Sequence, residues 1–147
     1  MQRKRQSNSH PVIGLDIGGA NIKAADTTGH TTSVEFPLWA KPHELGERLT
    51  SLLDSLTVPR QVVATMTGEL ADCFLDRATG VSQIIDQLCV ATGRLGIAEP
   101  LFYAVDGSFY RPADAAERVD AVAASNWHAL ASLIGQRMLP EDVQDAL

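Results

Sequence analysis

The sequence predicts a single α/β lobe, a mixed β-sheet with flanking helices whose elements follow in the chain order βββαβαβ. Three observations predict it. The chain has 147 residues, about the size of one domain. Hydrophobic residues make up 45% and charged residues 20%, as in globular rather than disordered, collagen-like or coiled-coil chains. Short apolar runs typical of strands alternate, after the first three, with helical patterns.

The first three predicted elements are strands joined by turns. Val12–Ile17 is a short apolar run that ends at two glycines, and 21–25 resumes an alternating pattern, so we expect a tight hairpin between them. A second turn is predicted at 27–30 and a third strand at 31–38.

A helix and a fourth strand follow. Pro42 opens a helical pattern that Pro59 closes, with leucines on one face at positions 45, 49, 52, 53 and 56. The run Gln61–Met66 is apolar and β-branched enough to predict a strand buried on both faces. Sheet, helix and strand in this order form a crossover connection.

The next elements are two helices and a fifth strand. Residues 67–68 turn the chain into a short helix that runs to Leu75, and 81–95 predict a longer helix. The fifth strand is expected at 101–105 and stops at Asp106-Gly107.

Two helices and two tails complete the chain. Helical patterns cover 113–122 and Ser125–Met138, the second with an inward apolar face made of Trp127, Leu130, Ala131 and Ile134. We expect a disordered basic tail at 1–10, a folded lobe at 11–138 and an acidic tail at 139–147.

Charge and cysteine content restrict the partners. The net charge is −6, and it falls to −9 without Arg3, Lys4 and Arg5, so the body of the protein is a poor ligand for nucleic acid. Cys73 and Cys89 lack metal-site spacing and indicate reduced thiols. No window predicts a signal peptide or a membrane span. We therefore expect a cytoplasmic protein that binds neither nucleic acid nor membrane.

The turn after the first strand carries the main candidate site. Gly18 and Gly19 expose backbone N–H groups that can cradle phosphate, Asn21 and Lys23 lie on the returning strand, and Asp16 can hold a hydrated Mg²⁺. The alternative is an ordinary hairpin in which the glycines satisfy positive φ and Asp16 caps the turn.

Four further residues are candidates for catalysis or substrate binding. Glu69 and Asp72 lie three apart at the opening of a predicted helix, so we expect them on one face as general acid, base or amine-orienting groups. The alternative is two exposed acids that favour the helix dipole. Asp106 ends a predicted strand, where α/β sheets present ligands, although turn chemistry explains Asp-Gly equally well. Trp127 is either a wall for an aromatic substrate or a core residue.

The pattern Asp-x-Gly-Gly-x-Asn-x-Lys between two antiparallel strands resembles the first phosphate motif of the sugar-kinase, Hsp70 and actin superfamily (ASKHA). That resemblance implies a ribonuclease-H-like fold. The stretches 14–23, 64–74 and 124–131 are similar to the amino-terminal half of hydantoinase/oxoprolinase-related proteins of tetrahydromethanopterin-linked one-carbon (C1) metabolism. Thr-Met-Thr-Gly-Glu-Leu at 65–70 is the most specific of these runs, and Asn126 and Trp127 match the third.

The resemblance implies a chemistry. Archaeal members are assigned to methanofuran biosynthesis, where a furan-methyl diphosphate condenses with an acceptor and pyrophosphate is lost. The phosphate-binding residues would then be Gly18, Gly19, Asn21 and Lys23, with Mg²⁺ on Asp16, Glu69 and Asp72 as catalytic residues, and Asp106, Asn126 and Trp127 on the substrate. The resemblance also implies an amine acceptor.

The family continues into a second phosphate motif, Asp-x-Gly-Ser/Thr-Thr-Thr, that this sequence lacks. We therefore expect a site that is incomplete alone and that needs a second lobe or a homodimer mate. Two alternatives stay open: an ATP-dependent amidohydrolase of the hydantoinase type, because the turn serves ATP as readily as diphosphate, and a non-catalytic partner-binding domain.

Overall fold

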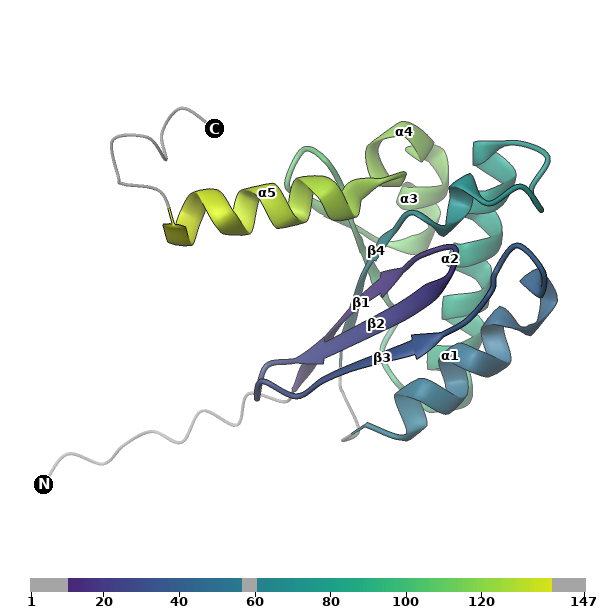
Figure 1. The fold of residues 1–147 in the computed structure, drawn as a ribbon, viewed down its shortest axis with the longest axis horizontal. Coiled ribbons are helices and arrows are strands. Elements are labelled where there is room, and N and C mark those ends of the chain that lie inside the picture. Colours follow the sequence, from purple (N-terminus) through teal and green to yellow (C-terminus); the bar gives the residue numbers. More distant parts are fainter. Residues whose placement is uncertain (1–10, 57–60, 139–147) are drawn as a thin grey trace, which may run out of the picture.

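The computed structural model describes residues 11–56 and 61–138. The two predicted tails, 1–10 and 139–147, and the expected helix end at Pro59 lie outside the described residues. Figure 1 shows the strands in the middle of the molecule, with α1 and α2 on one side and α5 reaching away on the other.

The sheet has six strands in the order β3-β2-β1-β4-β5-β6. β1 pairs antiparallel with β2 and parallel with β4, β5 pairs parallel with β4, and β6 is antiparallel to β5. The α/β class and the mixed sheet with flanking helices are confirmed. The strands are β1 (Val12–Ile17), β2 (Asn21–Asp26), β3 (Thr31–Glu35), β4 (Gln61–Met66), β5 (Leu101–Tyr103) and β6 (Phe109–Tyr110).

The helices lie between and after these strands. They are the 3₁₀ turns η1 (Pro42–Glu44) and η2 (Gly68–Leu70) and the α-helices α1 (Leu45–Asp54), α2 (Arg77–Arg94), α3 (Pro112–Glu117), α4 (Val119–Val122) and α5 (Ser125–Met138). In the described part of the chain, no helix combines the length and apolar content that crossing a membrane requires.

The core lies between the sheet and the pair α1 and α2. Alternate residues of β1 and β4 are buried on this side, and the leucine face predicted for α1 is buried at Leu45, Leu49, Leu52 and Leu53. The alternating residues on the opposite face of β4 are only half-buried. The expectation of a strand buried on both faces is therefore wrong, because α5 covers that face incompletely.

The chain between β4 and α2 departs from the predicted short helix. It forms one 3₁₀ turn, η2, and then bends until Asp76, whose carboxylate accepts a hydrogen bond from the Thr79 N–H at 2.8 Å and caps α2. The helix predicted at 113–122 is two short helices, α3 and α4, with a break at Arg118. Neither β6 nor this break was expected, since each involves only one or two residues.

The inward face expected for α5 is wrong. Trp127 is 70% exposed, Leu130 51% and Ile134 43%, and Ala131 is also exposed. The side turned to the sheet instead carries small and polar residues, with Ser125 and Gly135 buried. Tyr103 of β5 holds this side through a 3.0 Å hydrogen bond between its hydroxyl and His128 Nδ1.

Candidate active site

The parallel pairing of β1 and β4 brings their carboxyl ends to one edge of the sheet. Asp16 lies beside Thr65 and Ile17 beside Met66 in register. The Thr67 N–H donates to the Ile17 carbonyl at 3.0 Å and continues the pairing past the end of β4. Ligands of open α/β sheets bind outside the carboxyl ends of parallel strands, so this edge is where a site is expected.

A cleft of about 550 Å³ opens at this edge. It is bounded by the β1–β2 turn, the end of β4 and the first turns of α5. Seven of the ten predicted site residues line it, while Glu69, Asp72 and Asp106 do not. The full lining is Asp16, Gly18, Gly19, Ala20, Asn21, Lys23, Thr65, Thr67, Asn126, Trp127 and Leu130.

Some backbone N–H groups of the β1–β2 turn form hydrogen bonds within the protein, and others have no partner among the described residues. The Gly18 N–H donates to the Asn21 carbonyl at 3.0 Å, so this amide already has a partner within the turn, and phosphate binding by Gly18 stays a prediction. Phe36 and Leu38 donate to the carbonyls of Ala20 and Gly19, both at 2.9 Å, and hold the turn against the chain after β3. The N–H groups of Gly19 and Ala20 have no partner among the described residues.

The two glycines have different reasons to be glycine. Neither has positive φ, so the alternative in which both glycines serve positive φ is wrong. A Cβ on Gly18 would lie 3.0 Å from the Asn21 carbonyl oxygen, so the tightness of the turn explains this residue. A Cβ on Gly19 would meet nothing within 4 Å. The fold therefore does not require glycine at position 19, whereas a ligand approaching the free amides would.

One carboxylate and one ammonium group face the cleft. Asp16 Oδ1 accepts from the Thr65 hydroxyl at 3.3 Å, and Lys23 Nζ lies 3.4 Å from Asp16 Oδ2. The Asp16 side chain is 27% exposed and that of Lys23 61% exposed. Across residues 11–56 and 61–138, no cluster of three His, Cys, Asp or Glu side chains could cage a metal. A hydrated Mg²⁺ that keeps most of its waters fits Asp16, because such an ion takes only one or two carboxylates.

Glu69 lies behind the cleft rather than in it. Its side chain is 2% exposed, and Oε1 accepts the Ala124 N–H at 2.8 Å, at the junction before α5. Burial raises the pKa of Glu69 above its ordinary value. Asp72 is exposed, in the bends after η2. The expectation that these two acids share one helix face is wrong, because η2 ends at Leu70.

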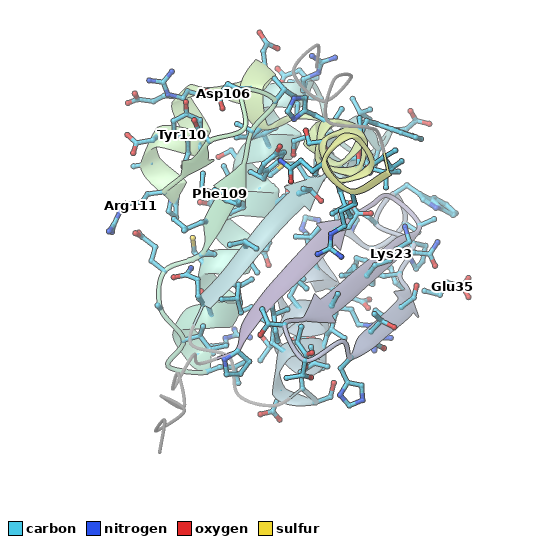
Figure 2. All side chains as sticks on the ribbon, turned by 90° about the vertical axis from the view of Figure 1, so that its left-hand side faces the viewer. Lys23, Glu35, Asp106, Phe109, Tyr110 and Arg111 are labelled. Carbon is cyan, nitrogen blue, oxygen red and sulfur yellow. The ribbon has the colours of Figure 1, made fainter. Side chains whose placement is uncertain are left out.

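Asp106 is used by its own turn. Its Oδ1 accepts the Ser108 N–H at 2.8 Å and its Oδ2 accepts the Tyr110 hydroxyl at 2.6 Å. The Tyr110 hydroxyl bond, with smaller help from Ser108, holds the pKa of Asp106 below its ordinary value. Figure 2 shows Asp106 beside Tyr110 and away from Lys23. The structure therefore gives Asp106 a turn-forming position outside the cleft.

The start of α5 forms the wall opposite the turn. Ala124 has φ 50, a left-handed conformation that redirects the chain into the helix. Asn126 and Trp127 then reach the cleft. The side-chain oxygens Ser125 Oγ, Asn126 Oδ1 and Glu69 Oε2 are buried without a hydrogen-bond partner in the described part of the chain. Four lining residues were not predicted as site residues: Ala20, Thr65, Thr67 and Leu130. Of these, Thr65 lies beside Asp16 in the parallel register of β1 and β4, and Thr67 continues that pairing.

No family model matches this chain. A curated protein of Methanocaldococcus jannaschii, (4-{4-[2-(gamma-L-glutamylamino)ethyl]phenoxymethyl}furan-2-yl)methanamine synthase, is 33% identical over an alignment of 129 residues. The match covers 85% of this chain and 37% of that protein. The chain thus spans little more than a third of this relative's length. The similarity supports the expected relation to methanofuran-biosynthesis enzymes, while membership of the wider superfamily stays a prediction.

Among solved structures, the chain is similar to T. thermophilus RuvC in complex with Holliday junction substrate. The identity is 16% and the TM-score 0.42, over 83% of this chain and 96% of that one. A likeness of this size carries no conclusion about fold or function, and the ribonuclease-H-like fold stays a prediction.

Proposed function

We propose that this chain supplies the anion-binding side of a transferase-like site in methanofuran and tetrahydromethanopterin-linked C1 metabolism. Its ligand is a small molecule that carries a phosphate or diphosphate group, bound with Mg²⁺. Gly19 carries the proposal: it lines the cleft, its N–H has no partner among the described residues, and neither backbone conformation nor packing requires a glycine there. The 33% identity to the synthase of M. jannaschii supports the reaction class.

The proposed reaction exchanges one carbon–oxygen bond for another. The bond between the furan-methyl carbon and the diphosphate breaks, the acceptor oxygen bonds to that carbon, and the acceptor proton is released with pyrophosphate. The relative's printed name contains a phenoxymethyl ether, so we replace the expected amine acceptor by a phenol oxygen. Negative charge grows on the departing diphosphate, which needs donors and cations already in position.

The cleft offers such groups on one side. Gly19 and Ala20 both line the cleft with amides that have no partner among the described residues, and the Lys23 ammonium adds a positive charge. The Thr67 hydroxyl is a further donor at the end of β4. Asp16 would hold Mg²⁺ through water molecules of the ion, which would neutralise charge on the leaving group. With the ion bound to Asp16, the Lys23 ammonium would turn from Asp16 to the diphosphate.

The other side of the cleft suits an aromatic ring. Trp127 and Leu130 present apolar surface to it, and Asn126 adds an amide group. A furan ring lying against Trp127 would bury apolar area and set the distance between the ring and the turn. Glu69 acts at this wall indirectly, because its bond to the Ala124 N–H fixes where α5 begins.

Calorimetric titration with pyrophosphate and Mg²⁺ tests the proposal. We expect the wild-type chain to bind and Gly19→Ala to bind about tenfold more weakly or worse. Alanine keeps the N–H, but its Cβ would obstruct the close approach of the anion, and one hydrogen bond to a charged group is worth about 1.5–3 kcal/mol. Thermal stability should not fall, because the new Cβ meets nothing within 4 Å.

Gly93→Ala is the matched control: position 93 is an equally open glycine on α2, far from the cleft, and affinity should not change. Equal pyrophosphate affinity in wild type and Gly19→Ala would refute the proposal.

Incubation with ATP and Mg²⁺ distinguishes the proposed diphosphate transferase from the alternative, an ATP-dependent amidohydrolase of the hydantoinase type. If the cleft served ATP, the chain alone or with added second-lobe protein would release ADP and phosphate. We expect no release of ADP. We also expect ATP to compete only weakly with pyrophosphate for the cleft. Release of ADP would replace the diphosphate-transfer proposal by the amidohydrolase.

A further inference from the structure

An apolar stripe lies exposed along the solvent side of α5. It consists of Trp127, Leu130, Ala131 and Ile134, and we call it the α5 stripe. These positions follow the spacing i, i+3, i+4 and i+7, so they lie on one side of the helix. Leu133, next to the stripe, is also 50% exposed. Four large apolar side chains gathered on one helix face differ from single exposed residues, which are ordinary on any surface.

From this arrangement we propose that the α5 stripe is a self-association surface, and that its occupant is the same stripe of a second copy of this chain. The spacing is self-complementary. When two α5 helices pack antiparallel about a two-fold axis between Leu130 and Ala131, Trp127 faces Ile134 of the other copy and Leu130 faces its Ala131. Large side chains then meet smaller ones, which permits close helix packing.

The charge distribution favours the same occupant. The chain carries 18 acidic against 12 basic residues, so two copies repel each other over most approaches. The segment Ser125–Met138 contains no aspartate or glutamate, and its one permanent charge is the Arg137 guanidinium. A second copy therefore meets no acidic side chain on α5 itself, and antiparallel helices also align their dipoles favourably.

The proposed contact adjoins the cleft. Trp127 and Leu130 belong both to the α5 stripe and to the cleft wall. A partner helix across the stripe would cover the outer side of these two residues and shield the cleft from water. The inference does not depend on the proposed function, since association is measured without any ligand.

Sedimentation analysis of the full 147-residue chain over a concentration series tests the inference. We expect the mass to rise from 15.8 kDa toward twice that value. Ile134→Glu should raise the dissociation constant of the dimer at least about tenfold, the effect of losing a buried contact at an interface. Leu75→Glu is the matched control, because Leu75 is 92% exposed and outside the stripe, and its dimer should be unchanged.

Ala131→Glu is a second variant, which adds a charge at the proposed axis without removing a large side chain, and circular dichroism checks that each variant folds. Trp39→Phe leaves Trp127 as the remaining tryptophan of the two, so its emission should shift to the blue as the dimer forms. A wild-type chain that stays monomeric over the whole concentration series would overturn the proposal. The α5 stripe would then be a surface that a different polypeptide covers. A dimer that survives both stripe variants would overturn it equally.

Discussion

Glu69 is the residue whose role differs most from the pattern that drew attention to it. It was predicted either as a catalytic acid or base or as an exposed acid that favours the helix dipole, yet it is 2% exposed and bonded to the Ala124 N–H. Its neighbourhood is tight on the backbone side as well, where Gly80 of α2 approaches. The backbone of Glu69 contacts α2 and its carboxyl group bonds to the residue before α5, so we expect Glu69 to position the cleft wall.

The pH dependence of Glu69→Gln tests this positioning role. Burial raises the pKa of Glu69 above its ordinary 4.5, so the folded chain holds the proton more tightly than the unfolded chain. The stability that this group contributes is full below pH 4.5 and is lost as the pH rises through the folded-state pKa. Glutamine keeps an oxygen acceptor for Ala124 and does not titrate.

We therefore expect the free energy of unfolding of Glu69→Gln, relative to wild type, to increase from pH 4.5 toward neutral pH. Urea denaturation at both pH values measures it. Glu69→Ala, which loses the acceptor, should be less stable than Gln at every pH. Wild type and Gln variant with parallel pH profiles would show that the carboxyl is not held as described.

At the scale of the elements, the packing of α2 on η2 depends on the absence of a side chain at position 80. A Cβ on Gly80 would lie 2.7 Å from the Glu69 carbonyl oxygen and 2.8 Å from its Cα, both backbone atoms that cannot move aside. We expect Gly80→Ala to lower the free energy of unfolding by about 2 kcal/mol, the usual cost of overpacking.

Gly93 provides the opposite result on the same helix. A Cβ there meets nothing within 4 Å and the residue is exposed, so Gly93→Ala should stabilise the chain by about 0.5–1 kcal/mol. Thermal denaturation of the two variants compares them directly. If both shift the midpoint in the same direction, the close approach of α2 to η2 is not present in solution.

Element limits were predictable where a local pattern alone determines them. β1, β4 and α5 occur at the predicted residues, because apolar runs and capping residues define strand and helix ends locally. The side of α5 that faces the sheet was not predictable. Its apolar stripe has the stronger periodicity, but Ser125 and His128 contact the body of the protein, and that choice depends on the sheet surface beneath.

The candidate site was predictable to the extent that it is contiguous in sequence. The contiguous residues from Asp16 to Lys23 predict a glycine-containing anion site. Thr67 lies beside them only because β1 and β4 pair in parallel. Which amides are free could not be read from the sequence. Gly18 and Gly19 are chemically identical, and the hydrogen bond from Gly18 to Asn21 distinguishes them.

For the whole molecule, the distribution of charge and apolar surface leads to a prediction about salt. Two copies with a net charge of −6 repel each other, and the proposed contact at α5 is apolar and free of acidic residues. Added salt screens that repulsion, since the Debye length falls from about 10 Å at 0.1 M to about 3 Å at 1 M, and it leaves apolar burial in place. We therefore expect the dissociation constant of the dimer to fall as sodium chloride rises from about 0.1 M to about 1 M.

Sedimentation at several salt concentrations measures this constant, and the control variant Leu75→Glu should follow wild type. Weaker association at high salt would mean that ion pairs rather than the α5 stripe hold the copies together.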